Sequence, residues 1–145
     1  MLPVFDSDGN LPPGIHLASW NEFATRFGGN PGRKHLLVGR ERAIAVLRAA
    51  GCKRVYVDGS FVTSKATPGD YDLAWEPTSV NIALLLNLEP VFGVFDRGRA
   101  AQKANYFGEF FPSSANEALT GRTFLEFFQI DKDTGAPKGI VVLDL

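Results

Sequence analysis

The chain has 145 residues, of which 45% are hydrophobic and 12 are Phe, enough for a single domain with a substantial core. Its formal net charge of -1 excludes the global basic field that drives non-specific nucleic-acid binding. A lone cysteine, Cys52, excludes an internal disulfide and a cysteine-based zinc site. Because no window is long and apolar enough to cross a bilayer and the N-terminus lacks a signal-peptide pattern, we expect a cytoplasmic protein with no membrane partner.

The N-terminal third is expected to be an extended arm followed by two helices. Prolines and glycines among residues 1–18 disfavour a helix or a central strand there. The letters SWNE from Ser19 form a capping box and predict a short helix that ends at Gly28–Gly29. A longer helix should have Asn30 as its N-cap and end at Gly51. Its basic residues are expected on solvated faces, with nucleic-acid contact as the alternative: Arg33, Lys34, Arg40, Arg42 and Arg48.

The rest of the chain mixes strand and helix signals. Strands are predicted at KRVYVDG and YDLAW, with a loop between them that ends at Pro68–Gly69. SVNIALLLNL predicts a buried helix and VFGVF a short strand, and helices are expected in DRGRAAQKANYFG and SSANEALTG. The chain should finish as a β-hairpin in which KDTGAP joins the strands RTFLEFFQID and KGIVVLDL. Residues 1–145 are therefore expected to form one α+β domain with a mixed or antiparallel sheet, flanking helices and a C-terminal hairpin.

A candidate site lies between the first two predicted strands. Alternation along a strand places Asp70 and Asp72 on one face, about 7 Å apart for a rise of ~3.3 Å per residue, where they can share a divalent ion. Magnesium or manganese is favoured because such ions prefer oxygen ligands and leave positions for substrate phosphates. Gly59 lets a phosphate approach the backbone, and Ser60 with free N–H groups can bind its oxygens. The alternative is a solvated turn without a ligand.

The order of apolar strand, Gly-Ser, loop and Asp-x-Asp resembles the signature of the nucleotidyltransferase superfamily, which has the DNA polymerase β-like fold. Through LPPGIH, GRAAQK and FLEFFQ the whole chain also resembles small stand-alone bacterial members of unassigned function. The resemblance implies that Asp70 and Asp72 hold two Mg²⁺ ions and that Ser60 binds the triphosphate of a nucleoside triphosphate substrate. The nucleoside monophosphate would pass to a hydroxyl of an RNA 3′ end, a protein or a small molecule.

The resemblance also implies a third carboxylate on a neighbouring strand, acting as general base and metal ligand. Asp96 follows the first pair of acids by a helix-then-strand interval and is the first choice. Glu126 is the competitor, because it shares a face of its predicted strand with Phe124 and Phe128 and an acid there needs a partner. The alternatives without catalysis are a helix N-cap for Asp96 and a salt bridge for Glu126.

Two lysines complete the candidate site. Lys65 stands near the place where many small relatives have an Arg-Gly pair, and Lys103 shares a predicted helix face with Arg99 and Tyr106. Each can contact a triphosphate, and for each the alternative is a solvated side chain.

The resemblance also implies biological roles and partners. The superfamily includes toxins and phage-defence proteins, and a homodimer or a partner protein can complete the pocket. The alternative function is a catalytically degenerate nucleotide-binding or protein-interaction module.

Overall fold

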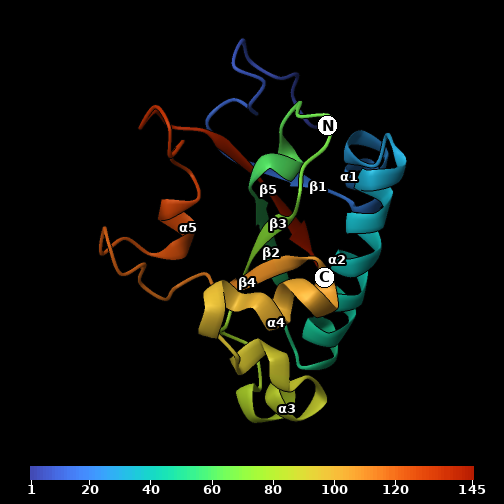
Figure 1. Ribbon diagram of the computed structural model, residues 1–145, viewed down its shortest axis with the longest axis vertical. Helices are drawn as coiled ribbons and strands as arrows, with labels where there is room; N and C mark the ends of the chain where they lie inside the picture. Colours follow the sequence, from blue (N-terminus) through green and yellow to red (C-terminus); the bar gives the residue numbers. More distant parts are fainter.

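Five strands form one mixed sheet in the order β1-β5-β2-β3-β4, in a computed structural model that describes residues 1–145 (Figure 1). β1 pairs with β5 and β3 with β4 in parallel, whereas β2 lies antiparallel to both β3 and β5. The small α+β domain therefore has the mixed sheet expected from the sequence. The strands are β1 Gly14–Ala18, β2 Arg54–Asp58, β3 Tyr71–Trp75, β4 Gly108–Pro112 and β5 Gly139–Asp144.

The first two helices begin where the sequence predicts. In α1 (Trp20–Phe27) the Ser19 side chain accepts a hydrogen bond from the Glu22 N–H. In α2 (Pro31–Ala49) the Asn30 side chain caps the Arg33 N–H. The other helical elements are α3 Ile82–Leu88, α4 Asp96–Tyr106, α5 Phe124–Phe127 and the short 3₁₀ turns η1 Ser60–Val62 and η2 Pro90–Gly93. None of the helices is both long enough and apolar enough to span a membrane.

The two faces of the sheet are covered differently. Figure 1 shows α1 and α2 along one side and α5 on the other. Alternating strand residues such as Val57, Leu73 and Val141 belong to the larger core, and the residues between them belong to a smaller cluster that α5 covers. Each fully buried side chain of this kind contributes about 1.5–3 kcal/mol to stability. The smaller cluster comprises Tyr56, Ala74, Phe111, Phe128, Ile140 and Val142.

The predicted C-terminal hairpin is wrong. Residues 122–131 contain α5 instead of a strand, because Thr123 and Glu126 form a complete capping box around its first turn. β5 does not pair with this segment and lies between β1 and β2. An isolated bridge between Ile130 and Pro137 is the only strand-like pairing across the KDTGAP turn.

Several local expectations also need correction. Residues 14–18 of the predicted arm form the edge strand β1. Only Leu85 of α3 is buried, so this helix is largely exposed and not a core helix. The VFGVF segment begins in the 3₁₀ turn η2, where Pro90 occupies the first turn, and is not a strand. Residues 113–121 form turns without a helix, as the Glu117 carboxylate accepts from the N–H groups of neighbouring residues.

Two basic residues of α2 are buried, contrary to the expected solvated faces. Arg40 is 0% exposed and Arg33 is 6% exposed. Both lie on the face of α2 that packs towards the aromatic ring of Phe61, which is 5.1 Å from the Arg33 guanidinium carbon and 4.0 Å from that of Arg40. The spacing along α2 already places both on the apolar face, since Arg40 lies four residues after Leu36 and four before Ile44, but arginine is so rarely buried that a solvated position was expected.

Candidate functional site

Three carboxylates lie side by side across the sheet. Strand register pairs Asp58 of β2 with Asp72 of β3, and Asp72 with Glu109 of β4. Directly paired residues on adjacent strands point to the same face, so these acids form a continuous row on the face that α5 partly covers. Asp70 lies two residues before Asp72 and is close enough for its charge to act on that carboxyl. We call these four residues the acid row.

Burial and mutual repulsion disfavour the charged forms of the acids in the row. Burial, followed by the charges of Asp58, Glu109 and Asp70, raises the pKa of Asp72 to about 7. Burial also raises the pKa of Asp58, and the positive charge of Lys138 opposes that rise. The Asp58 side chain is only 5% exposed, and its Oδ1 accepts no well-aligned hydrogen bond. The Lys138 ammonium, 3.2 Å from this oxygen, is the cation that compensates its burial.

Two lysines form ion pairs with the outer members of the acid row. Lys138 Nζ lies 3.2 Å from Asp58 Oδ1, and Lys103 Nζ lies 2.8 Å from Glu109 Oε1. The hydrogen bond to Glu109 raises the pKa of Lys103. The central Asp72 has no such partner, which is consistent with its raised pKa.

The turn after β2 brings backbone close to the acids. Gly59 has a φ of 86°, a conformation that favours glycine, and a Cβ at this position would lie 3.1 Å from Asp72 Oδ2. Ser60 then begins η1, and the Thr63 hydroxyl donates to the Ser60 carbonyl at 2.6 Å. The Gly-Ser pair therefore stands directly beside the acid row.

Arg33 of α2 holds the loop that follows this turn. Its guanidinium donates to the Phe61 carbonyl at 2.7 Å, to the Thr63 carbonyl at 2.9 Å and to the Lys65 carbonyl. It also reaches the Phe27 carbonyl at 3.2 Å. Because the planar guanidinium carries five donors in a rigid fork, one side chain can order the entire loop between β2 and β3.

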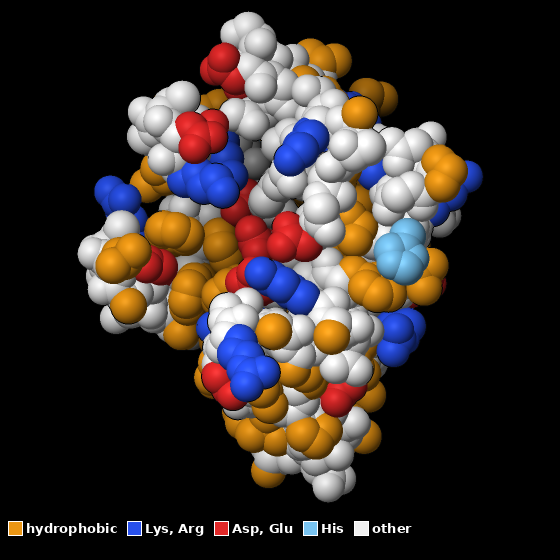
Figure 2. Space-filling model, in the orientation of Figure 1, with side chains coloured by type: hydrophobic (Ala, Val, Ile, Leu, Met, Phe, Trp, Pro, Cys, Tyr) orange, Lys and Arg blue, Asp and Glu red, His pale blue; other side chains and the backbone are white.

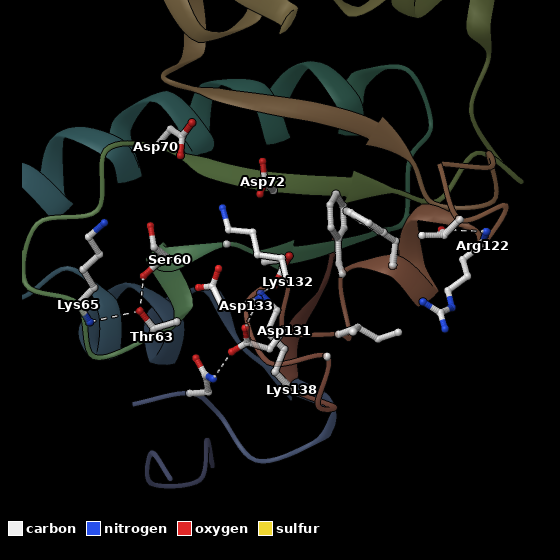
Figure 3. Close-up of a pocket in the computed structure, with 18 of the residues that line it drawn as sticks. Ser60, Thr63, Lys65, Asp70, Asp72, Arg122, Asp131, Lys132, Asp133 and Lys138 are labelled. Atoms are coloured by element: carbon white, nitrogen blue, oxygen red, sulfur yellow. Dashed lines mark hydrogen bonds and ion pairs between the residues drawn. The ribbon is translucent and has the colours of Figure 1, made fainter. Parts of the chain in front are cut away.

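A polar cleft of about 1150 Å³ is lined by the Gly-Ser turn and by Asp58, Asp70 and Asp72 of the acid row, whereas Glu109 lies outside its lining. Figure 2 shows acidic side chains gathered in a central hollow with basic side chains around it. Figure 3 shows Asp70 and Asp72 on one wall, with Lys132 and Lys138 across the cleft. Its charged lining residues are Asp58, Asp70, Asp72, Asp131 and Asp133 together with Lys65, Arg122, Lys132 and Lys138.

The oxygen-only donor set fits a hard divalent cation. Mg²⁺ and Mn²⁺ prefer carboxylates and retain positions for water or phosphate, and the row supplies carboxylates beside the Gly59-Ser60 turn. As they stand, no three acidic, histidine or cysteine side chains are close enough together to hold a metal ion. Metal binding would thus require side-chain rotation within the row.

Comparison with known proteins places the sequence in a family. A family model described as a family of unknown function (DUF6932) matches residues 3–144. The chain belongs to this family. No curated protein and no solved structure matches it.

For this DUF6932 member, the structure brings most of the sequence-predicted site residues together. Gly59, Ser60, Lys65, Asp70 and Asp72 line the same cleft. Lys103 does not line it and is instead engaged with Glu109. The expected shared face of Arg99, Lys103 and Tyr106 is occupied within the fold, because Arg99 donates to the Phe110 carbonyl at 3.0 Å and the Tyr106 hydroxyl donates to Glu89.

Neither predicted third acid joins the row. Asp96 begins α4, and Glu126 caps α5 by accepting hydrogen bonds from the Thr123 N–H and hydroxyl. Neither residue lines the cleft. Glu126 was a candidate because a strand over residues 122–131 would place it on one face with Phe124 and Phe128, and the helix removes that reason.

Sequence reasoning missed Asp58 and Glu109. Asp58 ends the predicted strand directly before Gly59-Ser60, and Glu109 precedes Phe110 and Phe111 in a short β-favouring run. An acid at the end of a strand, directly before Gly-Ser, is a local pattern from which Asp58 could have been predicted as a site residue. Glu109 becomes a candidate only once β4 is placed beside β3.

Proposed function

We propose that the protein transfers a nucleoside monophosphate from a nucleoside triphosphate to a hydroxyl acceptor, on a nucleotidyltransferase-like fold. The observation that carries the proposal is the acid row, three of whose members, Asp58, Asp70 and Asp72, line one cleft with the Gly59-Ser60 turn and basic residues, while Glu109 adjoins Asp72 on β4. The Gly-Ser and Asp-x-Asp motif in the sequence supports the same chemistry, without any use of how the strands pair.

Asp70, Asp72 and Glu109 would hold Mg²⁺ or Mn²⁺, with Asp58 next to them. Bound metal would supply positive charge to the phosphates and lower the pKa of the acceptor hydroxyl. Gly59 and Ser60 would bind the triphosphate through backbone N–H groups and the serine hydroxyl, with Lys65 at the cleft wall. These groups act mainly by position and charge.

Glu109 is the proposed general base, replacing Asp96 and Glu126 in that role. It lies on the strand beside Asp72, and its side chain is 22% exposed, so an acceptor can reach it. The carboxylate takes the proton of the acceptor hydroxyl, the hydroxyl oxygen forms a bond to the α-phosphorus, and the bond to the leaving pyrophosphate breaks. An RNA 3′ end, a protein hydroxyl or a small molecule fits this scheme, and a toxin or phage-defence role is compatible with it.

One observation favours a second candidate, a nucleotide-binding or protein-interaction module without catalysis. Asp58 and Glu109 are both already paired with lysines, and no three-ligand metal group is formed. In that case a second copy or another protein would use the cleft as a binding surface, and nucleotide would bind without turnover.

Incubation with each α-labelled nucleoside triphosphate, Mg²⁺ or Mn²⁺ and cellular RNA, protein or metabolite fractions tests the proposal. We expect metal-dependent label transfer that falls by at least ~10³ in the Asp70→Asn/Asp72→Asn and Glu109→Gln variants. Asp96→Asn and Glu126→Gln are matched controls that remove equivalent carboxylates outside the acid row and should retain transfer. Undiminished transfer in the double variant would refute the assigned site, and binding without transfer would favour the module.

A further inference from the structure

Lys138 occupies a distinctive position among the basic residues of the cleft. Its side chain is 16% exposed and pairs with an Asp58 side chain that is 5% exposed, whereas Lys103 is 43% exposed in its pair with Glu109. Lys138 lines the cleft together with Gly59 and Ser60, but Lys103 does not. Lys138 is therefore a half-buried basic residue that pairs with the acid row and lines the same cleft as the candidate phosphate turn.

The backbone that carries Lys138 is held in place. The Lys138 N–H donates to the Gln129 carbonyl at 2.8 Å, and the Gly139 N–H donates to the Leu11 carbonyl at 2.9 Å. Lys138 directly precedes β5, which lies within the sheet next to β2. The ammonium can then change partners by rotation of its flexible four-carbon stem, without movement of the sheet.

The Lys138 ammonium beside Asp58 and a divalent ion held by the neighbouring acids would repel each other, because Asp58 and Asp72 are paired across β2 and β3. In the structure, Lys138 offsets part of the repulsion and desolvation that raise the pKa values of Asp58 and Asp72. A divalent ion bound by the row would supply more positive charge at the same place and repel the ammonium. Released from Asp58, the ammonium would have two anions in the cleft to pair with: Asp131, whose pKa its charge already lowers, and a triphosphate seated at Gly59 and Ser60.

We propose that Lys138 is an exchangeable counter-ion: it pairs with Asp58 in the metal-free protein and moves to the triphosphate when metal binds. The inference rests on the proposed function, because it assumes that the cleft takes a metal-bound triphosphate. It assigns Lys138 two linked effects, weakening metal binding in the absence of nucleotide and strengthening nucleotide binding in the presence of metal.

The metal arm of the test uses Mn²⁺ alone, titrated into the purified chain and followed by calorimetry or by the electron paramagnetic resonance signal of free Mn²⁺. Lys138→Met should bind Mn²⁺ about tenfold more tightly than wild type, because the competing charge is gone. Lys65→Met removes the same charge from the same cleft but breaks no ion pair, so its Mn²⁺ affinity should change by less than about threefold. Lys138→Arg, which keeps the charge, should stay near wild type.

The nucleotide arm measures binding of a non-hydrolysable triphosphate analogue at saturating Mn²⁺. Lys138→Met should bind the analogue about tenfold more weakly, and Lys138→Arg should restore most of the affinity. Tighter Mn²⁺ binding together with weaker analogue binding by Lys138→Met identifies the exchange. If Lys138 were only structural, its replacement would weaken the binding of both ligands. Circular dichroism melts check that each variant is folded.

Unchanged or weaker Mn²⁺ binding by folded Lys138→Met would overturn the inference, as would Mn²⁺ binding by neither protein. Tighter Mn²⁺ binding with weaker analogue binding, but no label transfer to any acceptor, would support the exchange and contradict the proposed transfer. Label transfer with both affinities unaffected in Lys138→Met would support the proposed function and contradict the exchange.

Discussion

Arg40 is a buried cation without a hydrogen-bonding partner. Its guanidinium carbon lies 4.0 Å from the ring centroid of Phe61, 4.1 Å from that of Tyr71 and 4.8 Å from that of Phe23. None of its side-chain nitrogens makes a hydrogen bond, and burial lowers its pKa to about 9. The aromatic rings therefore offset a desolvation cost that no carboxylate relieves.

This arrangement predicts an unusual order of stability. Arg40→Lys should lower the free energy of unfolding by about 2 kcal/mol, because a compact, strongly hydrated ammonium stacks poorly on rings. Arg40→Met should be at least as stable as the lysine variant, since it fills similar volume without a buried charge. Urea denaturation of the three proteins measures the order. A methionine variant clearly less stable than the lysine variant would contradict it.

Asp72 should make the metal-free protein less stable as pH rises. Its pKa is raised from 3.8 in the unfolded chain to about 7 in the folded one, so between these values the folded state holds a proton that the unfolded state has released. The contribution of Asp72 to the free energy of unfolding is fully present below about pH 4 and is lost as the pH rises through about 7. Each unit of pKa shift corresponds to about 1.4 kcal/mol.

Asp72→Asn should remove that loss. In EDTA at pH 8 we expect the variant to be more stable than wild type by ~2 kcal/mol, with a smaller difference at pH 5. Chemical denaturation at both pH values measures the difference. Equal pH dependence in the two proteins would show that Asp72 is not the group responsible. The same substitution should abolish transfer, so stability and activity would change in opposite directions.

At the scale of elements, α2 carries the residue that orders the loop between β2 and β3. Arg33→Lys replaces a fork that contacts several carbonyls with a single ammonium. We expect faster amide hydrogen exchange in residues 60–66 and roughly tenfold weaker triphosphate binding, with α2 still folded. Arg48→Lys, on an exposed part of the same helix, is the matched control. Unaltered exchange in the Arg33 variant would argue against the clamp.

For the whole molecule, ligand binding should appear as stability. If the cleft binds metal and triphosphate only in the folded state, the two together should stabilise the protein by about 2.7 kcal/mol at a ligand concentration 100 times the dissociation constant. A thermal melt with Mg²⁺ and each nucleoside triphosphate measures this shift. The Asp70→Asn/Asp72→Asn protein should show none, and a wild-type melt unaffected by every combination would count against the nucleotide site.

The sequence by itself determined the parts of this protein that depend on neighbours along the chain. Ser19 and Asn30 cap helices through bonds to residues three positions away, so α1 and α2 were predictable. β-Branched and aromatic composition located β2 and β3, and the Gly59-Ser60 pair located the turn beside Asp72. Where two local signals competed, as in residues 122–131, the β-favouring aromatic composition suggested a strand, but the Thr123–Glu126 capping box and packing against Phe111 favoured α5.

Only the tertiary structure decided which distant residues meet. The place of β5 between β1 and β2, and of β4 beside β3, depends on which faces become buried, and short-range patterns do not encode sheet order. That order placed Glu109 next to Asp72 and excluded Asp96 and Glu126 from the row. It also placed Lys138 against Asp58. The acid row and its counter-ion are products of strand register, whereas the motif that led to them is a product of local sequence.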